Sequence, residues 1–210
     1  MTASDDKTRI RDAATIILLR RQAAGLSVLM GMRGAKAAFM PSKYVFPGGA
    51  VDPEDRDMAP PQADPLCLSR LRAEPRDDSD TPPEALLNAA LRELHEETGL
   101  HLRDGAAALR FVFRAITPPG RPRRFDARFF VGDAAQITGD PDDFSAACDE
   151  LSHLHWVPMS QARALNLPFI TEVVLAEVDA LARRGAALMP PPTVPFFDNR
   201  GHQPRFVQLP

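Results

Sequence analysis

The alternation of apolar and polar positions in the first fifty residues predicts a β-rich start. Residues 13–19 and 26–32 are apolar runs with β-branched residues, and the polar, glycine-containing stretch 20–25 between them indicates a turn. We therefore expect two antiparallel strands. Residues 44–52 form a further short strand that Gly48 and Gly49 interrupt, and a double glycine allows close approach of the backbone to another group.

A helix follows with start and stop signals at both ends. Thr81 is the expected N-cap, Pro82 the first helical residue and Glu84 the third, which together make a capping box. Gly99 is expected to end the helix. Leucines at helical spacing predict its buried stripe, namely Leu87, Leu91 and Leu94.

The remaining pattern mixes strands and helices. Strands are predicted at 110–116, 125–131 and 154–157, and helices at 159–165 and 170–184. Residues 53–80 are rich in proline and charge, and we expect a surface insertion with little internal structure beyond a weakly helical stretch at 66–71. Residues 186–210 are expected to form a proline-rich C-terminal tail. Elements that do not alternate strictly favour an α/β fold, a mixed sheet covered on both faces, as one domain over 1–210.

Composition narrows the class of protein. A chain of 210 residues with 44% hydrophobic content can bury one sizeable core, and a net charge of −3 gives no general attraction to duplex nucleic acid or an anionic membrane. The apolar runs fall short of the roughly 18 residues that a membrane span needs. The two cysteines, Cys67 and Cys148, are too few for a disulfide framework, so we expect free thiols and a cytoplasmic protein.

Three carboxylates on the predicted helix are the main candidate for chemistry. Glu93, Glu96 and Glu97 fall within an arc of roughly 100°, because residues three and four apart are neighbours on a helix. Like charges this close raise one another's pKa unless a cation lies among them. Mg²⁺ or Mn²⁺ is the expected cation, and its usual further ligands are substrate phosphates. The alternative is a solvated acidic face without a function.

The surrounding spacing decides between these alternatives. Glu84 lies eight positions before Arg92, and residues 92–100 read Arg-Glu-Leu-His-Glu-Glu-Thr-Gly-Leu. This resembles the second half of the Nudix box, which runs Gly, five residues, Glu, seven residues, Arg-Glu, an apolar residue, any residue, Glu-Glu, any residue, Gly, an apolar residue. The box glycine should stand at position 78, where this chain has Asp78. Gly49 resembles the missing glycine, which makes residues 53–80 an insertion inside the box.

The resemblance implies a Nudix-type α/β/α sandwich and a role for each matching residue. It makes Glu93, Glu96 and Glu97 metal ligands, joined by a backbone carbonyl at Gly48 or Gly49. It gives the other box positions a structural role, with an ion pair between the first two of them: Glu84, Arg92 and Gly99. Bound Mg²⁺ or Mn²⁺ would polarise phosphoryl oxygens and activate water.

The proton acceptor and the phosphate-binding cations are less clearly marked. The family uses a glutamate of the box, here Glu93 or Glu97, or one on a loop before the last strand, where Glu150 stands beside Asp149. The alternative is that Glu150 is a surface residue. Arginines could hold substrate phosphates in bidentate geometry, unless their loop is only solvated; the candidates are Arg33, Arg121, Arg123 and Arg124.

The substrate is expected to be a small nucleotide-like molecule with a diphosphate linkage. Arg33 lies at the distance from Phe-Pro-Gly-Gly that coenzyme A diphosphatases show, although Ala38 and Ser42 replace the arginine and glycine of that motif. The long insertion is similar to the insertion-bearing group of these enzymes, which makes CoA or acyl-CoA the first candidate. ADP-ribose, NADH and dinucleoside polyphosphates are alternatives, as is a Nudix-fold sensor without turnover. Phe196, Phe197 and Phe206 are expected to cover the core or a partner subunit in a homodimer.

Overall fold

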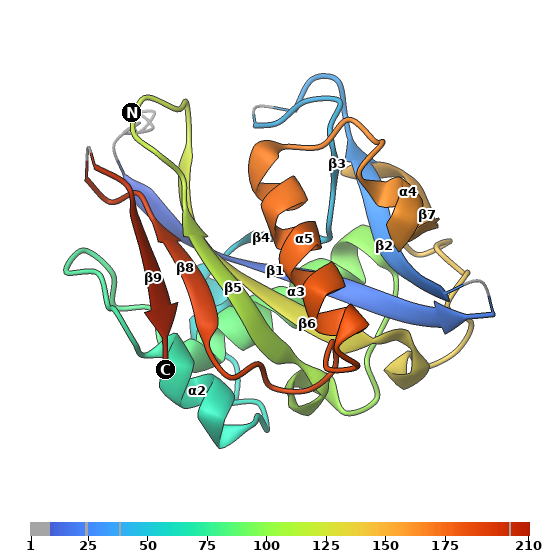
Figure 1. The fold of residues 1–210 in the computed structure, drawn as a ribbon, viewed down its shortest axis with the longest axis horizontal. Coiled ribbons are helices and arrows are strands. Elements are labelled where there is room, and N and C mark those ends of the chain that lie inside the picture. The colour runs from blue at the N-terminus through green and yellow to red at the C-terminus, as the bar shows by residue number, and fades with distance from the viewer. Residues whose placement is uncertain (1–8, 24, 38, 202) are drawn as a thin grey trace.

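A computed structural model describes residues 9–23, 25–37, 39–201 and 203–210. Its centre is a mixed nine-stranded sheet with the order β3-β2-β1-β6-β5-β8-β9, to which β4 adds at β1 and β7 at β2 (Figure 1). The strands are β1 (Ile10–Gln22), β2 (Gly25–Arg33), β3 (Tyr44–Val45), β4 (Gly48–Ala50), β5 (Arg110–Ile116), β6 (Arg124–Asp133), β7 (Leu151–Pro158), β8 (Val194–Asp198) and β9 (Arg205–Leu209). The predicted pairing of the first two strands is confirmed, because β1 and β2 are antiparallel neighbours.

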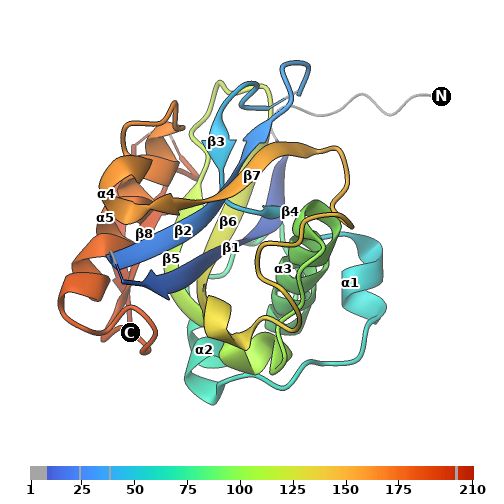
Figure 2. The same ribbon diagram turned by 90° about the vertical axis from the view of Figure 1, so that its right-hand side faces the viewer.

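Helices cover both faces of this sheet. They are α1 (Pro53–Asp57), α2 (Pro65–Leu71), α3 (Pro83–Thr98), α4 (Met159–Ala162) and α5 (Phe169–Arg183), with short 3₁₀ turns at Gly105–Ala108 and Ala134–Gln136. Figure 2 shows α1 and α3 on one side of the sheet and α4 and α5 on the other. The helices found in the described part of the chain are too short or too polar to cross a membrane.

Alternate residues of β1 build two separate cores. Ile16 and Leu18 belong to the cluster that packs under α3, whereas Ile17 and Leu19 belong to the cluster under α5. This follows from the period of two along a strand, which sends neighbouring side chains to opposite faces. The predicted α/β/α sandwich, formed by a single domain, is confirmed.

The helical stretch expected at 66–71 is confirmed by α2, but the expectation of little structure in the rest of residues 53–80 was wrong. The segment forms α1 and α2, and two of its arginines are buried. Arg70 donates to three backbone carbonyls of the C-terminal segment, those of Pro191, Pro192 and Pro210, at 2.5–2.8 Å. A buried guanidinium needs such acceptors, so the insertion is fixed against the body of the protein.

The C-terminal segment also has more order than its proline content suggested. Within 186–210, β8 pairs in parallel with β5, and β9 pairs antiparallel with β8. Phe196 is fully buried, and Arg114 lies over its ring at 4.2 Å. Phe206, in contrast, is 63% exposed on the last strand of the sheet. The tail is therefore part of the sheet, and Phe196 covers the core as expected.

The predicted capping box at the start of α3 was wrong. The helix begins at Pro83, with Pro82 as its N-cap and no side-chain cap. The Thr81 hydroxyl instead donates to Asp12 at 2.9 Å and accepts from Arg56. Two consecutive prolines supply no N–H groups, so less capping is needed here than in an ordinary first turn. At the other end, Gly99 adopts φ 75° as the C-cap, as expected.

A buried network of charges joins the insertion to the sheet. Arg76 donates to Asp12 at 2.9 Å and to Asp126 at 2.8 Å. Arg114 binds Asp126 through two nitrogens, and Arg128 donates to Asp12 at 2.6 Å. All five side chains are buried. Buried charges are stable only when they are paired and hydrogen-bonded, and the network meets that condition for both carboxylates.

The network predicts acid sensitivity centred on Asp12. Burial alone would raise the pKa of Asp12, but Arg128, the Ser79 hydroxyl and Arg76 together lower it to about 2. A lowered folded-state pKa gives stability that is present above pH 4 and is lost as the pH falls toward 2. We expect this carboxyl to account for a loss of about 2 kcal/mol in the free energy of unfolding over that range.

Denaturant unfolding at a series of pH values between 5 and 2 measures this loss. The variant Asp12→Asn is the control, because it cannot titrate at this position. Its free energy of unfolding should fall less steeply with decreasing pH than that of the unmodified protein. Equal slopes in the two proteins would contradict the role of Asp12.

Candidate active site

Two glutamates of α3 lie against the double glycine of β4. Gly49 is so close to Glu93 that a Cβ atom on the glycine would lie 2.2 Å from a carboxylate oxygen. The backbone N–H of Gly48 donates to Glu97 at 2.7 Å. A β-carbon at position 48 would also meet the backbone of β1, at 2.4 Å from the carbonyl oxygen of Ala14. The glycine pair thus allows the close backbone approach that the sequence predicted.

Glu97 is a buried carboxylate with one oxygen that is not hydrogen-bonded in the described structure. The residue is 1% exposed, and one of its oxygens, Oε1, is buried without a hydrogen-bond partner in the described structure. Burial raises the pKa of Glu97 to about 8, against the hydrogen bond from Gly48, and the charges of Glu93 and Glu150 act in the same direction as burial. Burial also raises the pKa of Glu93. Positive charge placed here would be stabilised by both side chains.

Arg92, on the same helix, connects the glutamates to neighbouring elements. Its Nη1 atom donates to Glu93 at 2.9 Å and to Glu96 at 3.0 Å, and Nη2 donates to the carbonyl of Ala50 at 3.0 Å. Its main partner is Asp55, which it contacts through Nε and Nη2, both at 2.9 Å. The arginine therefore ties the helix of the glutamates to α1 and to the end of β4.

The predicted ion pair between Glu84 and Arg92 was wrong. Glu84 instead accepts from Arg72, a residue of the insertion, at 2.9 Å. The carboxylate that sequence reasoning missed is Asp55, which is fully buried. Asp55 stands six positions after Gly49, which is the spacing between the glycine and the first glutamate of the box. The sequence therefore marked this position, but with an aspartate where the motif has a glutamate. Asp55, within the predicted insertion 53–80, thus has the contact with Arg92 that the resemblance gave to Glu84.

Arg33 and Glu150 complete the group of charges. Arg33 ends β2, and its Nη2 atom donates to Glu150 at 2.8 Å. Glu150 affects the pKa of both Glu93 and Glu97, and Arg33 affects that of Glu97. The structure therefore brings Arg33 and Glu150 to the group of predicted site residues on α3 and β4.

Comparison with known proteins agrees with this geometry. The family model of the NUDIX domain matches residues 80–178. A NUDIX hydrolase from Alicyclobacillus acidocaldarius is similar in structure, with 29% identity, a TM-score of 0.60, and coverage of 80% of this chain and 90% of that one. The chain therefore carries a Nudix domain. It is a hydrolase of phosphoric anhydride bonds, of the class that acts on nucleoside diphosphate-linked substrates.

A more distant match supports the fold alone. The NUDIX domain of Shewanella oneidensis NrtR, solved in complex with ADP ribose, has 13% identity and a TM-score of 0.56. The match covers 86% of this chain and 94% of that domain. The Nudix architecture thus extends well beyond the residues that match the family model, and includes the strands before α3.

The Nudix glutamates do not form a ready-made metal cage as they stand. Within the described ranges, no three His, Cys, Asp or Glu side chains are gathered closely enough to hold an ion. Arg92 donates to both Glu93 and Glu96. The unpartnered oxygen of Glu97 nevertheless fits a divalent cation, because such ions prefer carboxylate oxygens.

The basic loop of the Nudix domain is only partly available. Arg124 is buried, and its Nε and Nη2 atoms donate to the carbonyls of Thr117, Asn199 and Arg200. These contacts contradict the substrate-binding role predicted for Arg124 and give it a structural one. Its neighbour Arg121 is exposed and Arg123 half-buried. Both stay predictions, as does the motif position Ala38, which lies outside the described residues.

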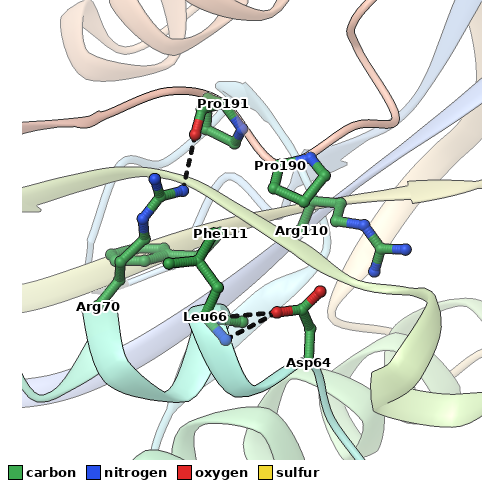
Figure 3. A pocket seen from close by; sticks show the side chains of 8 residues that line it. Asp64, Leu66, Arg70, Arg110, Phe111, Pro190 and Pro191 are labelled. Carbon is green, nitrogen blue, oxygen red and sulfur yellow. Dashed lines mark hydrogen bonds between the residues drawn. The ribbon is translucent and has the colours of Figure 1, made fainter. Parts of the chain in front are cut away.

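A surface pocket lies elsewhere in the molecule, between α2, β5 and the C-terminal segment (Figure 3). Two of its polar side chains already have partners, since Asp64 caps α2 and Arg70 donates to Pro191. Burial raises the pKa of the Cys67 thiol in its wall to about 11, so this cysteine is a poor nucleophile. Cys67 and the exposed Cys148 are both free thiols, as predicted. The pocket is a junction between the insertion and the tail.

The two candidate box carboxylates can be told apart by mutation. Asp55→Asn should lower the free energy of unfolding by about 2 kcal/mol, because it removes a buried charge-assisted pair with Arg92. Glu84→Gln, on a partly exposed pair with Arg72, should cost less than about 1 kcal/mol. Urea unfolding followed by circular dichroism measures both. Equal costs, or a larger cost at Glu84, would restore the original assignment.

Proposed function

We propose that the protein is a metal-dependent pyrophosphohydrolase that uses Mg²⁺ or Mn²⁺. The first candidate for its substrate is CoA or acyl-CoA. The observation that supports this best is the buried, unpartnered oxygen of Glu97 beside Glu93. A binding module has no need to bury a carboxylate oxygen without a partner beside a second buried carboxylate. The intact set of glutamates therefore favours turnover over a sensor that only binds.

The ligands of the metal would be Glu93, Glu96 and Glu97, with the backbone carbonyl of Gly49. When bound, the ion would supply positive charge that polarises phosphoryl oxygens and lowers the pKa of a water molecule. The protein contributes orientation: the N–H of Gly48 fixes the carboxylate of Glu97, and Arg92 holds Glu93. To bind the ion, Glu96 has to exchange its contact with Arg92 for one with the metal, which its half-exposed position allows.

The proton acceptor in this proposal is Glu150, with Glu93 and Glu97 as alternatives inside the box. Glu150 precedes β7 and is half-exposed, so it can reach a water molecule at the edge of the carboxylate group. Arg33 beside it would bind a substrate phosphate, because a guanidinium matches two phosphate oxygens. Arg121 and Arg123 are further candidates for phosphate contacts.

The preference for CoA rests on the spacing of Arg33 before Phe-Pro-Gly-Gly and on the insertion within the box. The distant match to a domain in complex with ADP ribose makes ADP-ribose the second candidate, with NADH and dinucleoside polyphosphates after it. The products separate these substrates. CoA would yield 3′,5′-ADP and phosphopantetheine, whereas ADP-ribose would yield AMP and ribose phosphate.

The test is hydrolysis of this panel with Mg²⁺ or Mn²⁺, with products identified by mass. The highest kcat/KM for CoA or acyl-CoA would support the first candidate, and a preference for another compound would replace it. Tight binding of a panel member without turnover would support the sensor.

A cytoplasmic location and a homodimer stay predictions. Light scattering coupled to size exclusion measures the assembly directly.

A further inference from the structure

Strand pairing brings together Arg33 and Glu150, two residues separated by 117 positions. Arg33 is the last residue of β2 and lies opposite Leu151, the first residue of β7. Glu150 immediately precedes Leu151, so its side chain lies next to Arg33. The resulting ion pair has an N–O distance of 2.8 Å.

The pair adjoins the carboxylates of α3. The charge of Glu150 acts on both Glu93 and Glu97, and the charge of Arg33 acts on Glu97 in the opposite sense. The backbone N–H of Cys148, two residues before Glu150, donates to the carbonyl of Glu96 at 2.8 Å, which places this segment against the C-terminal part of α3. In this state the carboxylate of Glu150 is held by Arg33.

Arg33 has unused capacity for a better partner. Its Nε atom is buried and has no hydrogen-bond partner among the residues that the structure describes. Glu150 occupies only Nη2, and its own side chain is 51% exposed. Ion pairs with an exposed member are weak, because water competes for both charges. A phosphate group carries more charge than a carboxylate and has enough oxygens to bind two guanidinium nitrogens at once.

We propose that the Arg33–Glu150 ion pair is exchanged when substrate binds: a substrate phosphate takes the guanidinium of Arg33, and Glu150 is released beside Glu93 and Glu97. The inference rests on the proposed function and gives the contact between Arg33 and Glu150 a role in it. Arg33 is the phosphate receptor, and it also controls when the carboxylate of Glu150 becomes free. No bond is made or broken in this step beyond the exchange of one anion for another.

A double-mutant cycle on binding tests the exchange. The probe is α,β-methylene-ADP with Mg²⁺, which carries the adenosine diphosphate part of the candidate substrates and resists hydrolysis, and calorimetry gives its Kd. Arg33→Gln should weaken binding about tenfold to a hundredfold. Glu150→Gln should tighten it about twofold to fivefold, because the pair no longer has to open. In the Arg33→Gln background, Glu150→Gln should have no effect.

Two further variants exclude simpler explanations. Asp149→Asn removes the same charge one residue away, so an equal tightening there would show a general charge effect and overturn the exchange. Arg33→Lys keeps the charge without the two-pronged geometry, and it should recover part of the lost affinity. In steady-state assays Arg33→Gln should act mainly on KM, whereas a purely structural role would lower kcat and stability together.

The results separate this inference from the proposed function. Weakening by Glu150→Gln, or tightening that persists in the Arg33→Gln background, would overturn the exchange while hydrolysis by the unmodified protein continues. Absence of hydrolysis across the whole panel would instead overturn the proposed function. A probe that fails to bind the unmodified protein, which nevertheless hydrolyses a panel member, would also count against the exchange.

Discussion

Replacing Glu97 with glutamine is expected to lower kcat on the order of 10³-fold while the fold is preserved. The side chain is buried against Gly48 and carries the oxygen that has no partner in the described structure. Glutamine has the same shape, and its amide oxygen can still accept the hydrogen bond from Gly48. The change removes only the negative charge that the metal needs. Steady-state hydrolysis of the best panel substrate measures the loss.

The matched control for this variant is Glu84→Gln, which makes the same chemical change on the same helix. Glu84 pairs with Arg72 away from the double glycine, so kcat should stay within about threefold of the unmodified protein. Circular dichroism should show both variants folded. A Glu97→Gln protein that retains full activity would remove Glu97 from the metal site.

The largest effect on stability is expected at Asp126. This carboxylate is fully buried and accepts hydrogen bonds from Arg76 and Arg114, with Arg128 at 3.2 Å. Asp126→Asn leaves three buried guanidinium groups with one buried carboxylate, Asp12, and breaking a buried pair of this kind costs about 3–5 kcal/mol. Domains are stable by only about 5–15 kcal/mol, so the variant should be close to unfolding at room temperature.

Urea unfolding at pH 7 tests this expectation. Asp179→Asn is the control, because it breaks an exposed pair between Asp179 and Arg183 within α5 and should change little. The position of Asp126 between the insertion and the sheet predicts that limited proteolysis of Asp126→Asn begins in residues 72–80. A stability equal to that of the control would contradict the role given to the network.

Local signals in the sequence predicted most of the fold. The β1–β2 hairpin followed from two apolar runs around a polar turn, and the end of α3 followed from Gly99. The glutamates of α3 followed from helical spacing alone, because positions 93, 96 and 97 share one side of any helix. These features depend on residues that are close in sequence.

Features that depend on distant partners were missed. Thr81 carried the signal of an N-cap, but the buried carboxylate of Asp12, 69 positions away, takes its hydroxyl. Asp12 itself, with Arg76 and Asp126, looks like a scatter of surface charges until the sheet brings these residues together. The strands β8 and β9 were hidden because five residues each is short and prolines surround them.

The box carboxylate shows a different difficulty. Glu84 and Asp55 both stood at a spacing that the family motif allows, one counted back from Arg92 and the other forward from Gly49. The sequence alone could not decide which of the two residues contacts Arg92, because the predicted insertion 53–80 contains Asp55 and ends before Glu84. The contacts of Arg92 with Asp55 decide the question.

The most direct test of the central claim is the binding of Mn²⁺ to the protein without substrate. Electron paramagnetic resonance measures this binding as a loss of the signal of the free ion. The account predicts saturable binding by the unmodified protein and by Glu84→Gln, with affinity that rises with pH up to about 8 as Glu97 gives up its proton. It predicts binding weakened at least about tenfold in Glu97→Gln. Equal Mn²⁺ binding by Glu97→Gln and the unmodified protein would contradict the claim that the buried glutamates beside Gly48 and Gly49 form the metal site.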